Sequence, residues 1–358
     1  MNNLDPRLMV YGANGYSAQL IIEELIARKI NPVLAGRNKE EVSSLAQKYN
    51  LEFKIFDLSD EKEILVSLEG IHTLINCAGP FKYTAKELME ACLQSKTNYL
   101  DITGEMPVMH LAFSMIDNAR EKGVVIMPGV GFDIIPTDCL AKRLSERMPD
   151  ADNLKLGFLN KRGKISRGTM ITTLEFLGGT GKIRRNGRVI DSKIGEFRVK
   201  FKRGNFSFKG ISIPWGDVYS SYHSTGIKNA EVYLALPGVI IKLRTILLFA
   251  LRLLKIDSVK NIVKNYIGKN LTGPAKGERD SAETYIWGRV ESKDGRKIEE
   301  IYRVMEGYTL TAKGAAECSE RVLNNEVCPG TYTPSLAFGS GFLEHFIIEK
   351  IYSSAGDI

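Results

Sequence analysis

The sequence predicts an α/β fold with a parallel sheet first and a second, strand-rich domain after it. Three observations support this. The first 140 residues alternate short apolar runs with amphipathic stretches, which is typical of β-α-β units. A glycine turn separates the first apolar run from the first amphipathic stretch. After Asp138 the β-like runs become longer, and a chain of 358 residues is long enough for two domains.

Six apolar runs in the first part predict strands, at residues 8–11, 32–35, 53–56, 73–77, 99–102 and 124–127. Between the first two runs, apolar residues recur at helical spacing and predict a helix that begins near Gly15. These residues are Ala18, Ile21, Ile22, Leu25 and Ile26. Strand, glycine turn, helix and strand follow one another within about 30 residues, which is the context that a dinucleotide-binding turn requires.

The second part contains a predicted hairpin. Residues 197–213 read FRVKFK, then RGN, then FSFKGIS, which indicates two strands joined by a short glycine-containing turn. Alternation alone explains the mixture of aromatic and basic residues if Phe197, Val199 and Phe201 point inward, so nucleic-acid binding is disfavoured.

Residues 238–256, GVIIKLRTILLFALRLLKI, predict an apolar, basic helix. A membrane span needs about 20 nearly uncharged residues. Because Lys242, Arg244 and Arg252 interrupt this segment, we do not expect it to span a membrane. Two interpretations stay open: a helix in the core or a dimer interface, or one lying on an anionic membrane surface.

Composition excludes several classes of protein. Hydrophobic residues make up 44% and charged residues 25% of the chain, as expected of a folded domain. The five cysteines form no C-x-x-C pair and the four histidines are far apart, so neither a disulfide framework nor a metal site is expected. The first residues lack the pattern of a signal peptide, and we expect a cytoplasmic protein.

Positive charge is concentrated in the middle of the chain. Residues 155–209 hold fifteen Lys or Arg against three Asp or Glu, a charge of +12, whereas the whole chain carries +7. The remaining residues therefore sum to −5. Such asymmetry favours either an anionic partner for this segment or a solvated basic face.

The stretch VYGANGYSAQL, residues 10–20, predicts the cofactor turn. Gly12 makes the tight turn, Gly15 lets a diphosphate approach the helix N-terminus, and Ala18 is small enough to pack on the strand. The expected contacts of the diphosphate are Gly12, Asn14, Gly15, Tyr16 and Ser17.

The second strand predicts which cofactor binds. An NAD-binding domain usually has an acidic residue about 20 positions after the turn, where it binds the ribose hydroxyl groups. Here the strand ends in Ala35-Gly36-Arg37-Asn38, and Arg37 with Asn38 suits a 2′-phosphate. NADP(H) is therefore expected. Asp57 should approach the adenine, and Ala78, Gly79 and Pro80 the nicotinamide, because ligands bind beyond the carboxyl ends of parallel strands.

Several motifs carry a resemblance to a known family. They are YGANGYSA, LAGRN, NCAGPF, NYLDITGE, PGVGFDIIPTD and, later, IPWGDVYSSYHSTGIKNAEVY, GPAKGERD, GYTLTAKGA and GTYTPSLAFG. In order and spacing the chain resembles the saccharopine dehydrogenase-like oxidoreductases, and especially their branch of trans-acting enoyl reductases. The resemblance implies a Rossmann-type domain that binds NADP, a second α+β domain with a mixed sheet, and a C-terminal segment that returns to the first domain.

With this resemblance we assign residues 1–138 to the NADP-binding domain, 139–309 to a substrate and dimerisation domain, and 310–358 to the returning segment. It also implies lipid substrates or membrane association in some members. The chain departs from the family at Ser17-Ala18, where Thr-Gly is common, and at Lys82-Tyr83-Thr84, where a glycine often follows Pro-Phe. The second departure leaves the nicotinamide-facing loop undefined.

Catalytic residues are less well marked. No tyrosine is followed by lysine at the Tyr-x-x-x-Lys spacing of short-chain dehydrogenases. Candidates at the expected domain junction are Asp101, Glu105, Asp133, Asp138, Asp217, Tyr222 and His223. Of these, Asp133, Tyr222 and His223 are the predicted catalytic set, with His223 as proton donor because an imidazole pKa of about 6.5 suits that role.

The sequence thus predicts an NADP(H)-dependent oxidoreductase that transfers hydride to a carbonyl, imine or enoyl group, on a hydrophobic or acyl-linked substrate. Two alternatives remain: a saccharopine-type amino-acid dehydrogenase, and a protein that binds NADP without turnover. The expected partners are the substrate and a second copy of the chain in a homodimer. Under the interpretation that residues 238–256 lie on a membrane, its surface is a further partner.

Overall fold

The computed structural model describes residues 7–177, 180–238, 263, 266–267 and 271–354. The helix predicted at 238–256 lies outside these residues, except for Gly238. Contacts divide the chain into two compact units, one of residues 1–135 with 307–338 and the other of residues 136–306 with 339–358. Within the described part, no helix has the length and apolar character needed to cross a bilayer.

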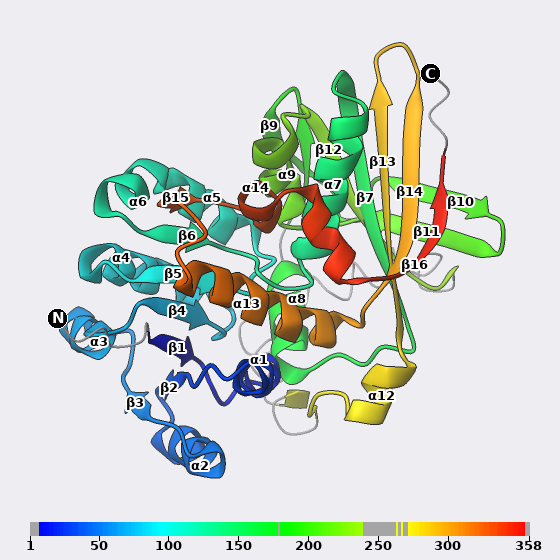
Figure 1. Cartoon of the computed structure of the whole chain (residues 1–358). Coiled ribbons are helices and arrows are strands. Elements are labelled where there is room, and N and C mark those ends of the chain that lie inside the picture. The colour runs from blue at the N-terminus through cyan, green and yellow to red at the C-terminus, as the bar shows by residue number, and fades with distance from the viewer. Residues whose placement is uncertain (1–6, 178–179, 239–262, 264–265, 268–270, 355–358) are drawn as a thin grey trace. The chain divides into compact units, whose positions relative to one another are not determined.

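The first unit contains a parallel sheet in the order β15-β6-β5-β4-β1-β2-β3, sheet A (Figure 1). Its strands are β1 (Leu8–Tyr11), β2 (Val33–Gly36), β3 (Phe53–Ile55), β4 (Thr73–Asn76), β5 (Asn98–Asp101), β6 (Val125–Met127) and β15 (Gly330–Thr331). The six predicted strands are confirmed, each to within one residue at either end. Order 3-2-1-4-5-6 is that of a dinucleotide-binding sheet, and the order reverses between β1 and β4.

Helices cover both faces of sheet A. The unit contains α1 (Tyr16–Ala27), α2 (Lys39–Tyr49), α3 (Glu61–Leu68), η1 (Phe81–Tyr83), α4 (Ala85–Ser95), α5 (Met106–Ser114), α6 (Ile116–Lys122), α13 (Gly307–Leu323) and α14 (Pro334–Phe338). The connections α3 to α6 pack on the face that carries Met9 and Tyr11. Helix α1, as predicted, begins directly after Gly15 and buries Ala18, Ile21, Ile22 and Leu25.

The second unit is built on a mixed sheet in the order β10-β11-β12-β7-β13-β14-β16, with β8 and β9 attached at β12. Only β12 and β7 pair in parallel among its described strands. The elements are α7 (Ile135–Arg147), β7 (Ala151–Lys161), α8 (Arg167–Leu177), β8 (Gly181–Arg185), β9 (Arg188–Ser192), β10 (Arg198–Arg203), β11 (Phe206–Ser212), α9 (Asp217–Thr225), β12 (Asn229–Ala235), α12 (Lys276–Ser281), β13 (Glu283–Ser292), β14 (Lys297–Val304), η3 (Ser340–His345) and β16 (Ile347–Ser353).

The predicted hairpin is formed by β10 and β11. Its alternation is confirmed, because every second residue of β10 is partly buried while Arg198, Lys200 and Lys202 are exposed. Phe201 stacks on Phe208 with ring centroids 5.4 Å apart, and both rings pack on the fully buried Trp287. This aromatic layer fixes the register of the hairpin, since a shift of one residue would expose every ring.

The C-terminal segment divides between the two units. Residues 307–338 add α13, β15 and α14 to the first unit. The strand β16 instead pairs antiparallel with β14 of the second sheet, whereas the family resemblance predicts that all of 310–358 returns to the first domain. The physical reason is the free edge of β14, which β16 covers with backbone hydrogen bonds.

Candidate functional site

The turn after β1 brings the ends of three strands together. Gly12 has a φ of +76°, and the N–H groups of Gly12 and Ala13 donate to the carbonyl oxygen of Ala35 at 2.8 and 3.0 Å. A Cβ on Gly12 would lie only 2.8 Å from the backbone nitrogen of Ala78, in the loop after β4. Both the positive φ and this contact exclude a side chain. The turn therefore lies at the switch point of sheet A.

The first turn of α1 presents backbone N–H groups at the same edge. The residue before the helix, Gly15, has an extended backbone and no side chain to cap it, and the first turn holds no acidic residue. The first N–H groups of a helix lack intrahelical acceptors, and the helix dipole adds partial positive charge there. A diphosphate beside Tyr16 and Ser17 would supply the missing acceptors.

Arg37 and Asn38 follow β2. Arg37 is exposed, and hydrogen bonds from Ser59 together with the nearby charge of Arg37 lower the pKa of Asp57. The Oδ1 atom of Asn38 accepts the N–H of Glu41 at 3.3 Å and caps α2. Asn38 thus already has a structural role at the helix start, so the predicted contact with a 2′-phosphate falls to Arg37.

The loop after β4 is closed by a buried amide. Asn76 accepts the N–H of Ala78 at 3.0 Å through Oδ1, and its Nδ2 donates to the hydroxyls of Thr84 and Tyr99 at 3.0 and 3.2 Å. The Thr84 hydroxyl in turn donates to the carbonyl oxygen of Ala78 at 2.8 Å. Thr84, which belongs to a departure from the family pattern, therefore closes the loop that contains Gly79 and Pro80.

Carboxylates tie this loop to its neighbours. Glu105 is buried, and it accepts the N–H groups of Phe81 and Lys82 at 2.8 and 3.0 Å. Asp101, at the end of β5, accepts the N–H groups of Thr103 and Gly129 at 3.0 and 2.9 Å. Through these bonds, the loops after β4, β5 and β6 are held together by backbone donors and two acidic side chains.

Asp133 lies beside this cluster, in the loop after β6. A Cβ on Gly104 would be 2.9 Å from a carboxylate oxygen of Asp133, so the carboxyl group packs against the loop that carries Glu105. Burial raises the pKa of Asp133 to about 7, and the charge of Glu105 adds to the effect. A carboxyl group with this pKa can both donate and accept a proton near neutral pH.

Comparison with known proteins agrees with this geometry. Residues 8–127 match the saccharopine dehydrogenase NADP binding domain. The match covers about a third of the chain and shows the type of this domain. NADP(H) is therefore the cofactor of this domain. The residues predicted to bind it fit this cofactor, since Gly12 and Gly15 carry no side chain that would obstruct a diphosphate and Arg37 follows β2.

Among curated relatives, the human saccharopine dehydrogenase-like oxidoreductase is 29% identical over 153 residues, which cover 37% of this chain and 35% of that protein. The trans-acting enoyl reductase of Mycobacterium ulcerans (strain Agy99) is 26% identical over 148 residues, covering 39% and 35%. The chain thus matches about a third of the length of each relative. The structure of saccharopine dehydrogenase (L-Glu forming) from Saccharomyces cerevisiae has the same overall fold, with a TM-score of 0.65, 12% identity, and coverage of 98% of this chain and 100% of that one.

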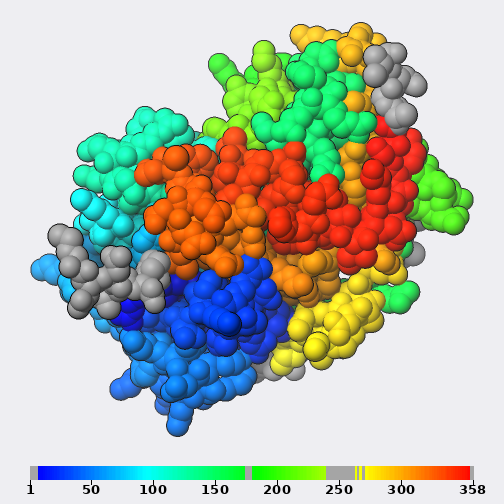
Figure 2. All heavy atoms as spheres, in the orientation of Figure 1, coloured from blue at the N-terminus to red at the C-terminus, as the bar shows by residue number. Residues whose placement is uncertain are grey.

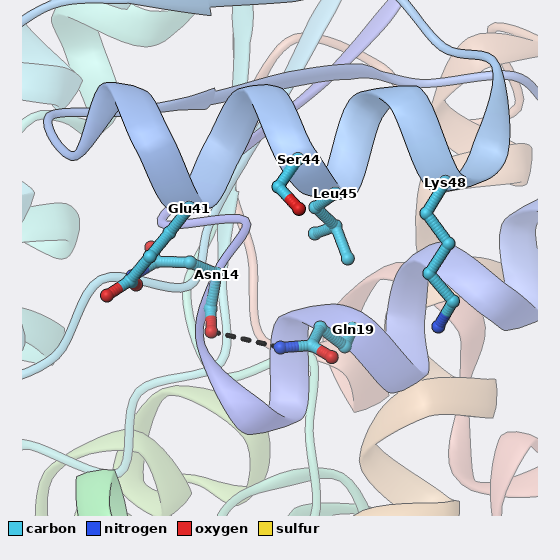
Figure 3. Close-up of a pocket in the computed structure, with 6 residues that line it drawn as sticks. All are labelled: Asn14, Gln19, Glu41, Ser44, Leu45 and Lys48. Carbon is cyan, nitrogen blue, oxygen red and sulfur yellow. Dashed lines mark hydrogen bonds between the residues drawn. The ribbon is translucent and has the colours of Figure 1, made fainter.

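A pocket of about 370 Å³ opens beside the turn of the NADP-binding domain (Figure 3). It lies between α1 and α2 and is lined by Asn14, Gln19, Glu41, Ser44, Leu45 and Lys48. Gln19 donates to the carbonyl oxygen of Asn14 at 3.1 Å, and the Asn14 side chain donates to Glu41. Asn14, a predicted cofactor contact, is thereby oriented by two helices before any ligand binds.

The other predicted catalytic residues belong to the second unit. Tyr222 and His223 are exposed on α9, with their ring centroids 6.0 Å apart, and His223 also packs on Tyr219 at 5.0 Å. Tyr222 covers the buried guanidinium of Arg184 at 4.6 Å. Arg184 donates to the carbonyl oxygens of Val218, Gly187 and Tyr219. Tyr222 therefore shields a structural arginine, and its catalytic role stays a prediction, as does that of His223.

Among the side chains that the structure describes, no group of three His, Cys, Asp or Glu residues is placed to hold a metal ion. Most of the free cysteines described are buried, and burial raises the pKa of Cys77, Cys92 and Cys318 far above the ordinary thiol range.

Replacing Arg37 with alanine is expected to weaken NADPH binding by about 10- to 100-fold and to leave NADH binding unchanged. The reason is that a guanidinium adds a charge-assisted, bidentate contact only when a 2′-phosphate is present. Titration of wild type and variant with both cofactors measures this. Lys86→Ala is the control, because it removes an exposed cation of the same domain that pairs with Glu90 on its own helix. Equal losses of affinity for NADPH and NADH would show that Arg37 does not bind the 2′-phosphate.

Proposed function

We propose that this protein is an NADP(H)-dependent oxidoreductase that reduces a carbonyl, imine or enoyl group. The observation that carries the proposal is the contact between Gly12 and the loop at Ala78, which leaves a side-chain-free cradle at the start of α1. NADPH supplies a hydride when it is bound. The chain then has to orient the cofactor, exclude water and place a proton donor near the acceptor group.

Asp133 is the donor that the described residues favour. It follows β6 on the carboxyl edge of sheet A, where ligands of such sheets bind. Because burial and Glu105 raise its pKa to about 7, the carboxyl group can hold a proton near neutral pH. That proton can pass to the oxygen, nitrogen or carbon that becomes basic as hydride arrives. Glu105 acts through Asp133 and is a positioning residue.

Transfer of deuterium tests the proposed reaction. Purified protein is incubated with NADPH carrying deuterium on either face of C4 and with a panel of enoyl, keto and imino compounds, including saccharopine-type imines. Deuterium in one product, from one face only, supports the oxidoreductase and identifies the acceptor class. Tight NADPH binding with no transfer to any compound would favour a protein that binds the cofactor without turnover.

The proposed substrate is hydrophobic or linked to an acyl chain. Its delivery from an anionic lipid surface is supported by the exposed face of the β10–β11 hairpin. Lys200 is directly opposite Lys209 in the antiparallel register, with Arg198 and Lys202 on the same strand face. Like charges in opposing positions destabilise a sheet. Residues 197–213 contain no acidic residue to offset them, so an anionic ligand is the compensation we infer.

Charge reversal on the hairpin is expected to reduce binding to phosphatidylglycerol vesicles. Lys200→Glu with Lys209→Glu should lower vesicle affinity by about 10-fold or more, because each cation near an anionic surface contributes about 1 kcal/mol. Co-sedimentation measures the affinity at two salt concentrations. Lys86→Glu with Lys122→Glu makes the same charge change on exposed lysines of the other unit. Charged side chains also protect an edge strand such as β10. Unchanged affinity in the hairpin variant would leave only that protective role.

Self-association of the chain remains part of the proposal, as a homodimer whose interface we assign to the second unit. Light scattering at several concentrations measures the mass, and a value of one chain throughout would contradict it.

A further inference from the structure

Sheet A has one face that the first 135 residues do not cover by themselves. The connections from β4 to β6, which include α4, α5 and α6, all pass over the face that carries Met9 and Tyr11. On the opposite face, a further helix beside α1 is needed to cover β4 and β5. That helix is α13, which comes from the far end of the chain and packs on α1, β4 and β5 (Figure 1).

Helices α1 and α13 run parallel, with their N-termini together at the cofactor edge. Tyr16, the first residue of α1, meets Tyr308, the second residue of α13. At the other end, Arg28 follows α1 and pairs with Glu317 at 2.6 Å and Glu320 at 2.8 Å. In the space-filling view the two helices adjoin along the same side of the unit (Figure 2).

The contact between Tyr16 and Tyr308 is an edge-to-face ring pair. The centroids are 5.0 Å apart and the ring planes meet at 87°, which is the favoured arrangement for two aromatic rings. Tyr16 belongs to the first turn of α1, whose N–H groups would bind the diphosphate. The position of the Tyr16 ring is therefore linked to the position of the backbone at the start of α1.

The start of α13 is itself fixed to the carboxyl edge of the sheet. The hydroxyl of Thr311 accepts the N–H of Phe132 at 3.0 Å and donates to the carbonyl oxygen of Gly307 at 2.8 Å. Gly131 packs directly against the Thr311 side chain. Tyr308 is therefore held between the loop after β6 and the glycine turn after β1, and its position is not free to follow that of Tyr16.

We propose that Tyr308 is a positioning residue for NADP(H): its ring holds the first turn of α1 in the shape that binds the diphosphate. The cofactor site would then depend on a residue nearly 300 positions away, outside the matched domain of residues 8–127. This inference rests on the binding of NADP(H) by that domain.

A double-mutant cycle tests the inference. NADPH affinity is measured by calorimetry for wild type, Tyr16→Ala, Tyr308→Ala and the double variant, together with the melting temperature of each. Tyr308→Ala should weaken NADPH binding about 10-fold, whereas Tyr308→Phe should retain wild-type affinity. The double variant should bind NADPH no worse than whichever single variant has the lower affinity, because the effects of changing two residues in contact are not additive. Tyr308→Leu replaces Tyr308→Ala if the alanine variant does not fold.

Arg28→Gln provides the matched control at the other end of the same helix pair. It should lower the melting temperature slightly by breaking the ion pairs with Glu317 and Glu320, because such pairs contribute little to stability. NADPH affinity should stay within about twofold of wild type, because Arg28 follows the other end of α1. If the losses of NADPH affinity in the two single variants add up in the double variant, or if Arg28→Gln loses as much affinity as Tyr308→Ala, Tyr308 contributes only to packing. If wild type binds NADPH and Tyr308→Ala binds it equally well, this inference alone fails. If wild type does not bind NADPH, the proposed function fails with it.

Discussion

Gly12→Ala is expected to reduce NADPH affinity by more than about 100-fold. The new Cβ would lie 2.8 Å from the nitrogen and 2.9 Å from the Cα of Ala78, so it meets backbone that cannot rotate away. A residue other than glycine also pays about 1–2 kcal/mol for the left-handed conformation at φ +76°. The turn after β1 or the loop after β4 must move, and both belong to the cofactor cradle. Calorimetric titration with NADPH gives the affinity.

Gly70→Ala is the control for backbone strain. Gly70 has a φ of +73° in the same unit, but a Cβ there meets nothing within 4 Å. The two variants therefore carry the same conformational cost and differ in the contact with Ala78. Circular dichroism establishes that both are folded at the temperature of the titration. If Gly12→Ala binds NADPH as Gly70→Ala does, the cradle is not where the diphosphate binds.

Asp133→Asn is expected to lower kcat by about 10²- to 10⁴-fold while NADPH affinity stays within twofold, because an amide has no proton to give. In wild type, the rate should fall as pH rises through about 7, since the donor is then lost. This fall, the alkaline limb of the pH–rate profile, should be absent from the profile of Asp133→Asn. His223→Ala should keep it. A limb that disappears in His223→Ala and persists in Asp133→Asn would transfer the donor role to His223.

Stability of the same variant follows from the raised pKa. An ordinary aspartate has a pKa of 3.8, whereas that of Asp133 is about 7 in the folded protein. The folded state thus binds this proton more tightly than the unfolded state, so stability decreases as pH rises from about 4 through about 7. Asp133→Asn removes this loss of stability. At pH 8 the variant should be more stable than wild type by a few kcal/mol, because each unit of pKa shift corresponds to about 1.4 kcal/mol. Below pH 4 the difference should vanish, and chemical denaturation at both pH values measures it.

Glu105→Gln tests the cause of the raised pKa. The change removes a negative charge beside Asp133 and keeps an oxygen that can accept the N–H groups of Phe81 or Lys82. We expect the pH limb of the rate to move to lower pH without disappearing. A limb that stays at its wild-type position would show that burial alone sets the pKa of Asp133.

The sequence by itself determined the strands of sheet A and the position of the glycine turn after β1. Periodicity and turn chemistry are local, so runs such as residues 8–11 and 73–77 could be read without knowing their neighbours. The same holds for the Gly12–Gly15 turn and for the absence of a carboxylate after β2, which predicted NADP. Alternation along β10 likewise showed which of its side chains point inward.

Only the tertiary structure decided which distant residues lie beside the proposed site. Glu105 binds the N–H groups of a loop 23 residues earlier, and Tyr308 meets a residue of the first helix. Neither pairing has a local signature, because a hydrogen-bond acceptor or an aromatic ring looks the same in sequence whatever it contacts. The division of the C-terminal segment, with α13 on sheet A and β16 at the edge of β14, depends in the same way on an uncovered sheet face and an unpaired strand edge. Those exist only once the rest of the chain has folded.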